Sequence, residues 1–284
     1  MLKVSIDEIE MSDYDICFDA KFEGHPFTGT ATEDDGDIHS EYVYKDGTAD
    51  GRWFSTYSDG SLQSETIFDM GREVSELVWN KDGKLSYEYM DSPLHIREYF
   101  DNGITKYDKD ECGYTFYYPD GNMLRQYIYS EKCEIIYSRD GEWLVKHRAE
   151  GNKELIFDVK NMEFNDEAMM KHWKQGLVDD INLEIYAGGY PEIYPYFTRW
   201  ISSLISHGKR QQAEEIIIEM IEQEYLAIKY DGITLAMKNK MQSAIPYILK
   251  VKDIDQSPAG YGNHAYGFTI GQIARMSLNE IRGN

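Results

Sequence analysis

Cysteine and long apolar runs are scarce in this chain of 284 residues. The three cysteines, Cys17, Cys112 and Cys133, form no CxxC pair and leave an odd number, which favours reduced, buried thiols over a disulfide framework or a zinc knuckle. No run of about eighteen apolar residues occurs, and the first residues contain no apolar stretch typical of a signal peptide. We therefore expect a soluble, cytoplasmic protein.

Basic residues are also in deficit. The chain has 29 Lys and Arg against 51 Asp and Glu, a net charge of −22, and residues 1–160 hold 35 acidic and 17 basic residues of these totals. The acids are densest around Glu33, Asp34, Asp35 and Asp37. Such a charge repels nucleic acid and anionic lipid and favours a basic protein partner, with a merely solvating acidic surface as the alternative interpretation.

Catalytic and cofactor motifs are missing as well. No GxSxG, HExxH, Walker A or local Ser-His-Asp pattern can be assembled. Residues 108–119 begin like a calcium loop, but the fifth position is Cys112 and the twelfth is Pro119, where a bidentate Glu is needed. We expect no catalytic, cofactor-binding or metal-binding residues and no enzymatic activity, with an enzyme of unfamiliar site as a minor alternative.

What the first half does contain is a repeated phrase: an aromatic residue, then Asp-Gly or Asn-Gly, then an apolar residue. Between the copies the chain alternates apolar and polar residues, which indicates strands with one buried face. Asp-Gly supplies the two positive-φ positions of a type I′ hairpin turn. The phrase predicts an elongated antiparallel sheet of repeated hairpins with a strip of aromatic rings, interrupted between residues 90 and 113, where the copies drift. The turn glycines are Gly47, Gly60, Gly83, Gly103, Gly121 and Gly141.

Beyond residue 160 the apolar positions recur every three or four residues, which predicts a helical domain. The first helix is expected to be capped by Asn165 and closed by Gly176, and a second to run from Pro191 or Pro195 to Gly208. A third contains Ile217 and Ile221 and ends at Asp231-Gly232. The fold class is therefore α+β, with a hairpin-repeat domain at 1–160 and an α-helical domain at 161–284.

Two family resemblances refine this assignment. The phrases Gly24-His25-Pro26-Phe27-Thr28-Gly29-Thr30 and Gly51-Arg52-Trp53-Phe54-Ser55-Thr56-Tyr57-Ser58-Asp59-Gly60-Ser61-Leu62-Gln63-Ser64-Glu65 resemble the MORN-repeat-variant proteins of bacteria, which act as antitoxin or immunity components. The stretch from Ser243 to Lys250 with the following helix through Ile270 and Ile273 resembles a HEAT-type helical hairpin. These resemblances imply a non-enzymatic, cytoplasmic binder that neutralises a cognate bacterial toxin.

The partner surface is expected to combine acids with aromatic anchors. A basic toxin would be attracted by the acids, while the aromatic candidates have a core role as their alternative interpretation. Open alternatives for the whole protein are a general MORN- or HEAT-type scaffold and a glycan- or membrane-surface-binding module. A monomer is expected. The candidate residues are Glu33, Asp34, Asp35, Asp37, Glu41, Trp53, Tyr57 and Trp79.

Overall fold

The computed structural model describes residues 2–11, 17–148, 162–182, 194–254, 256 and 268–283. It separates into two compact units, Met1–Glu142 and Trp143–Asn284. The first unit is a long mixed sheet and the second contains the helices, so the α+β class is confirmed. The predicted domain boundary at 160/161 lies outside the described residues.

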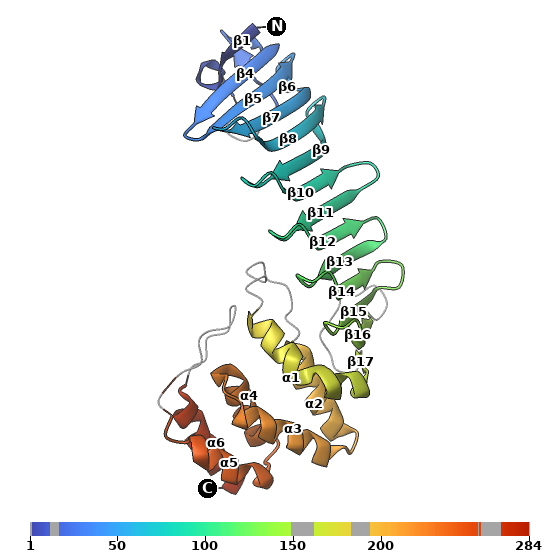
Figure 1. Ribbon diagram of the computed structural model, residues 1–284, viewed down its shortest axis with the longest axis vertical. Helices are drawn as coiled ribbons and strands as arrows, with labels where there is room; N and C mark the ends of the chain where they lie inside the picture. The colour runs from blue at the N-terminus through green and yellow to red at the C-terminus, as the bar shows by residue number, and fades with distance from the viewer. Residues whose placement is uncertain are drawn as a thin grey trace. The chain divides into compact units, whose positions relative to one another are not determined.

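The sheet of the first unit runs in chain order from β4 to β15, with each strand antiparallel to the next and only the short β6 off this path (Figure 1). The predicted interruption between residues 90 and 113 is wrong, because β10 to β13 pair without a gap. One edge strand, β1, pairs in parallel with β4, so the sheet is mixed where a purely antiparallel one was predicted. The strands are β1 (Leu2–Ser5), β2 (Lys21–Phe22), β3 (His25–Pro26), β4 (Gly29–Asp35), β5 (Ile38–Lys45), β6 (Thr48–Ala49), β7 (Gly51–Tyr57), β8 (Leu62–Asp69), β9 (Arg72–Trp79), β10 (Leu85–Met90), β11 (His95–Tyr99), β12 (Thr105–Asp110), β13 (Gly113–Tyr117), β14 (Met123–Ile128) and β15 (Cys133–Tyr137).

The turns of the repeat are one residue longer than predicted. A type I′ conformation occurs at Asp46-Gly47, with φ values of 52° and 81°, but in the five later copies only the glycine has a positive φ. In the second copy, Gly60 N donates to Tyr57 O at 2.8 Å, and Tyr57 N donates to the carbonyl of Ser61 at 2.8 Å. This is a three-residue loop, a type I turn closed by a left-handed glycine. The Asp before the glycine stabilises the turn through its side chain, because Asp59 Oδ1 accepts a hydrogen bond from Ser61 N at 2.9 Å.

Hydrogen bonds between turns give a reason for the tyrosine that precedes two of them. Tyr57 donates its hydroxyl to the carbonyl of Trp79 at 2.9 Å, and Tyr118 donates to the carbonyl of Tyr137 at 3.2 Å. Each bond joins a turn to the equivalent turn about twenty residues later. These bonds therefore connect turns that lie one repeat apart at the same end of the strands.

A hydrophobic core exists at the N-terminal end of the sheet. There the segment that connects β1 to β4 lays apolar side chains on one face, and the rings of Trp53 and Phe68 lie 4.5 Å apart. None of residues 69–112 is buried, so β9 to β12 form a single layer exposed on both faces. This middle section depends on cross-strand pairs for its stability. The core residues are Val4, Ile9, Ala20, Phe27, Ala31, Tyr44, Ala49, Trp53 and Phe68.

The three cysteines differ in exposure. Cys133 is buried, Cys17 is half-buried and Cys112 is exposed. The prediction of buried thiols is therefore correct for Cys133 and wrong for Cys112, which lies in the turn between β12 and β13 where no second layer covers it.

The second unit begins with a hairpin, so the prediction of a purely helical domain is wrong for its first residues. Strand β16 (Trp143–Arg148) pairs antiparallel with β17 (Met162–Phe164). Asn165 then caps the first helix as predicted, because its Oδ1 accepts a hydrogen bond from Ala168 N at 3.3 Å. The helices are α1 (Asp166–Asn182), α2 (Tyr194–Ser206), α3 (Arg210–Glu222), α4 (Leu226–Lys238), α5 (Ile245–Val251) and α6 (Ile270–Arg282).

Two predicted helix ends are wrong. Helix α1 continues through Gly176, and Asp231-Gly232 lies in the middle of α4. Gly232 faces α3 at close range: a Cβ built on it would lie 2.8 Å from Met220 Cβ and 3.0 Å from Ile221 N. The glycine is therefore needed for close helix packing. Within the part of the chain that the structure describes, no helix is both long and apolar enough to cross a bilayer.

Candidate protein-binding surface

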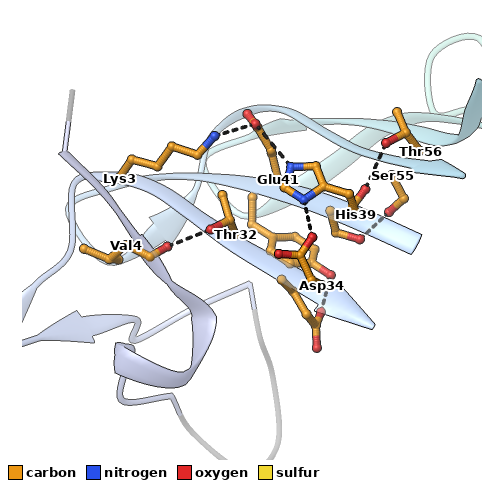
Figure 2. A network of polar contacts seen from close by, with 11 residues as sticks. Lys3, Val4, Thr32, Asp34, His39, Glu41, Ser55 and Thr56 are labelled. Carbon is orange, nitrogen blue, oxygen red and sulfur yellow. Dashed lines mark hydrogen bonds and ion pairs between the residues drawn. The ribbon is translucent and has the colours of Figure 1, made fainter. Parts of the chain in front are cut away.

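The predicted acids from Glu33 to Glu41, here called the acidic segment, lie on β4, β5 and the turn between them. Asp34 and Glu41 flank His39 on one face, as Figure 2 shows. His39 Nδ1 lies 2.7 Å from Asp34 Oδ1, and its Nε2 lies 3.6 Å from Glu41 Oε1. Glu41 also accepts a hydrogen bond from Lys3 Nζ at 2.7 Å, which lowers the pKa of its carboxyl group. Glu41 is thus paired with a lysine of the same unit, and Asp34 with a histidine that is a cation only when protonated.

The remaining acids of this segment are more available. Glu33 lies on the opposite face, where its Oε2 accepts a hydrogen bond from the Tyr42 hydroxyl at 2.8 Å. Asp37 is 76% exposed and 4.0 Å from Lys81 Nζ, a distance at which solvent weakens the attraction. Asp35 is exposed and has no ion-pair partner among the described residues. The acidic segment is only partly neutralised.

His39 is expected to titrate above the ordinary histidine pKa. The hydrogen bond with Asp34 raises its pKa most, partial burial opposes this, and Glu41 adds to the rise. A raised pKa means that protonated His39 stabilises the folded state at pH below about 6.5, a contribution lost as pH rises through the folded pKa. An NMR titration of the imidazole should give a pKa above about 6.5 that falls in the Asp34→Asn variant. An unchanged pKa in that variant would contradict the assignment to Asp34.

The aromatic candidates have different positions. Trp53 is 6% exposed and donates from Nε1 to the carbonyl of Val43 at 2.7 Å, so it belongs to the core and is closed to a partner. Tyr57 and Trp79 are half-buried neighbours, joined by the Tyr57 hydroxyl. Lys81 Nζ lies 5.8 Å from the Tyr57 ring centroid. These two rings remain partly accessible at the C-terminal ends of β7 and β9.

A larger group of rings on one face was not among the sequence candidates. Tyr114 and Tyr127 stack at 5.3 Å with an interplanar angle of 17°, and Tyr107 lies 4.7 Å from Phe116. The signal was present, because Tyr107 is a cross-strand partner of Phe116 and Tyr114 of Tyr127. Period-two alternation assigned these tyrosines to the sheet. It could not show that most of them stay partly exposed, because no second layer covers them. They are half-buried, with Phe116 buried.

Strands β10 to β12 carry an ion-pair network, and on β12 it lies on the face opposite the rings. Asp108 accepts a hydrogen bond from Arg97 at 3.2 Å and lies 3.0 Å from His95 Nε2. The Tyr99 hydroxyl donates to Glu88 at 3.0 Å. Asp108, the first residue of the failed calcium-loop pattern, is therefore engaged with side chains of β11. The network crosses three strands where no residue is buried, which suits a stabilising role.

The second unit contains an open pocket with a volume of 630 Å³ beside the α3–α4 connection. Lys229 lines this pocket, but its Nζ donates a hydrogen bond to the carbonyl of Ile221 at 2.7 Å. Burial lowers the pKa of its amine. Its amine therefore stabilises the C-terminal end of α3, where backbone carbonyls lack helical partners. The lining residues are Glu222, Gln223, Glu224, Leu226, Lys229, Ile254 and Gln256.

Comparisons with known proteins give little further information. No protein family model matches the chain, and no curated protein matches it. A solved structure, the Glycosylation Associate Protein (Gap123) complex from Streptococcus agalactiae, contains a chain that is similar at 17% identity with a TM-score of 0.17. The match covers 54% of this chain and 25% of the other, so this chain spans about a quarter of that chain's length.

Proposed function

We propose that this protein is a non-enzymatic binder of a basic protein partner, of the immunity or antitoxin type, which neutralises a cognate toxin in the cytoplasm. In this proposal the hairpin repeat is MORN-like, the helical unit is HEAT-like, and the protein acts as a monomer. The resemblance of the Gly24–Thr30 and Gly51–Glu65 phrases supports the family assignment.

The observation that carries the proposal is the charge of the first unit. Residues 1–142 hold 32 acidic and 13 basic residues, a net charge of −19, whereas residues 143–284 hold 19 and 16, a net charge of −3. The excess is spread over a sheet whose middle strands are exposed on both faces. A field of this sign and size accelerates association with a cationic protein and opposes nucleic acid and anionic membranes.

The test measures association with the product of the neighbouring gene, since an immunity protein is expected to be encoded beside its toxin. Reversing Asp34, Asp35 and Asp37 to Lys should lower the association rate constant about tenfold at low salt and flatten its salt dependence. The matched control reverses Glu163, Glu215 and Asp253, three exposed acids of the second unit, and applies the same change in net charge. Equal rates for both variants and the wild type would refute the proposal for this segment.

A further inference from the structure

One face of β9 and β10 combines tyrosine rings with glutamates. Glu76 is the cross-strand partner of Tyr89, and Tyr87 lies two residues from Tyr89, on the same face. Glu98 is the cross-strand partner of Tyr87 from the other side. A shift of register beside Phe68 brings Glu73 to this face too. Burial is the main cause that raises the pKa values of Tyr87 and Tyr89, and the charge of Glu73 raises both further. We call these five residues the tyrosine–glutamate patch.

Two of its carboxylates have no cation. Neither Glu73 nor Glu76 has an ion pair or hydrogen bond to any side chain in the described part of the molecule, although both are half-buried. Burial raises the pKa of each, and the charge of Glu73 raises that of Glu76 further. Desolvated carboxylates without a partner are unfavourable, so the patch would be stabilised by an incoming positive charge.

The basic residues nearby are engaged elsewhere or too distant. Arg72 pairs with Asp91 at 3.3 Å and approaches Asp69 at 4.0 Å, and Lys106 pairs with Glu98 at 3.2 Å. Lys109 lies on the same face but three strands from Glu76, about 14 Å at the usual strand spacing. No basic residue of the described part of the chain therefore pairs with these two glutamates.

We propose that the tyrosine–glutamate patch is the docking point for a lysine or arginine side chain of a partner protein. The inference rests on the proposed function and specifies where the basic partner makes its central contact. Rings beside carboxylates suit a cation doubly, because the ring faces attract it and the carboxylates pair with it. The surrounding surface is uncovered, since none of residues 69–112 is buried.

The charge of the unit selects this occupant over others. A second copy of the chain would bring the same net charge of −19 on its first unit, and nucleic acid or anionic lipid would be repelled in the same way. A neutral glycan could use the rings but would leave both glutamates unpaired. A cationic side chain is the occupant that satisfies the whole patch.

The test uses a deca-arginine peptide as the probe and the full chain as the receptor, with the dissociation constant measured by calorimetry at 50 mM salt. Glu73→Gln with Glu76→Gln should weaken binding at least tenfold, and Tyr87→Leu two- to fivefold. The matched control, Glu23→Gln with Glu131→Gln, removes the same charge from two exposed positions of the first unit that lie outside both the patch and the acidic segment, and it should change the dissociation constant less than twofold. Circular dichroism and the melting temperature report whether each variant is folded.

Equal weakening by the Glu73/Glu76 variant and the Glu23/Glu131 control would overturn the patch, since diffuse attraction would then account for binding, while the proposed function would stand. Binding unaffected in the Glu73/Glu76 variant would overturn it likewise. A wild-type chain that binds no deca-arginine would overturn the inference, and the proposed function would then be judged separately by association with the neighbouring gene product. If the Glu73/Glu76 variant melts at a lower temperature, the wild type provides an independent readout. Lys-rich and Glu-rich decapeptides are then compared as competitors of deca-arginine binding. Equal competition by both peptides would reject the inference.

Discussion

Replacing Arg125 with methionine is expected to destabilise the first unit by about 3 to 5 kcal/mol, because it removes an ion-pair partner of a buried carboxylate. Glu134 is 1% exposed and accepts a hydrogen bond from Arg125 Nε at 2.5 Å. The guanidinium also lies 5.9 Å from the ring centroids of Tyr114 and Phe116. Urea titration followed by circular dichroism should show the loss as a lower midpoint.

The double variant Arg125→Met with Glu134→Leu separates the cost of losing this ion pair at a buried carboxylate from the cost of altered packing. Most of the lost stability should return, since apolar replacement of both partners of a buried pair is often close to neutral. Arg52→Met is the control. It breaks the more exposed pair with Glu65 and should cost no more than about 1 kcal/mol. A single Arg125 variant as stable as the Arg52 variant would contradict this account.

The repeat was predictable because its turn residues carry a local requirement. Every glycine of the phrase has a positive φ. From Gly60 onward the period of about twenty residues places the turns at the same end of the strands, whereas the Gly47 turn lies at the opposite end, one strand earlier. The turn type was not predictable from Asp-Gly alone, because the same dipeptide forms a two-residue loop at Asp46-Gly47 and the end of a three-residue loop at Asp59-Gly60. The difference depends on which residues pair across the strands, which is a property of the register.

The candidate surface was predictable in charge but not in exposure. The acidic segment follows directly from the composition, and its partial neutralisation by Lys3 and Lys81 requires contacts 38 and 44 positions away in the chain. Alternation places Trp53 and Tyr87 on one face of the sheet without saying which is covered. The N-terminal segment buries Trp53, whereas no second layer buries Tyr87. Burial of that kind is decided by tertiary contacts that local patterns do not encode.

In the helical unit, too, local sequence predicts the role of one glycine correctly and that of another wrongly. Gly208 has a φ of 77° just after α2, in agreement with a role as a helix terminator. Gly232 follows an Asp, as five of the six turn glycines do, yet it lies at the seventh position of a helix of 13 residues. Apolar positions at Ile217 and Ile221 indicated one helix and could not reveal that the chain reverses after Glu222 to bring Gly232 against Met220.

Gly232→Ala should therefore destabilise the second unit by about 1 to 3 kcal/mol, although alanine favours an exposed helix by about 1 kcal/mol over glycine. The added Cβ would lie 2.8 Å from Met220 Cβ and 3.0 Å from the backbone nitrogen of Ile221, and a backbone atom cannot yield as a flexible side-chain end can. Lys238→Ala, at an exposed position of the same helix, should change stability by no more than about 0.5 kcal/mol. Urea titration of both variants measures the two effects. A Gly232→Ala variant more stable than the wild type would show that α3 and α4 can separate without cost, and that the glycine is present for some reason other than their close packing.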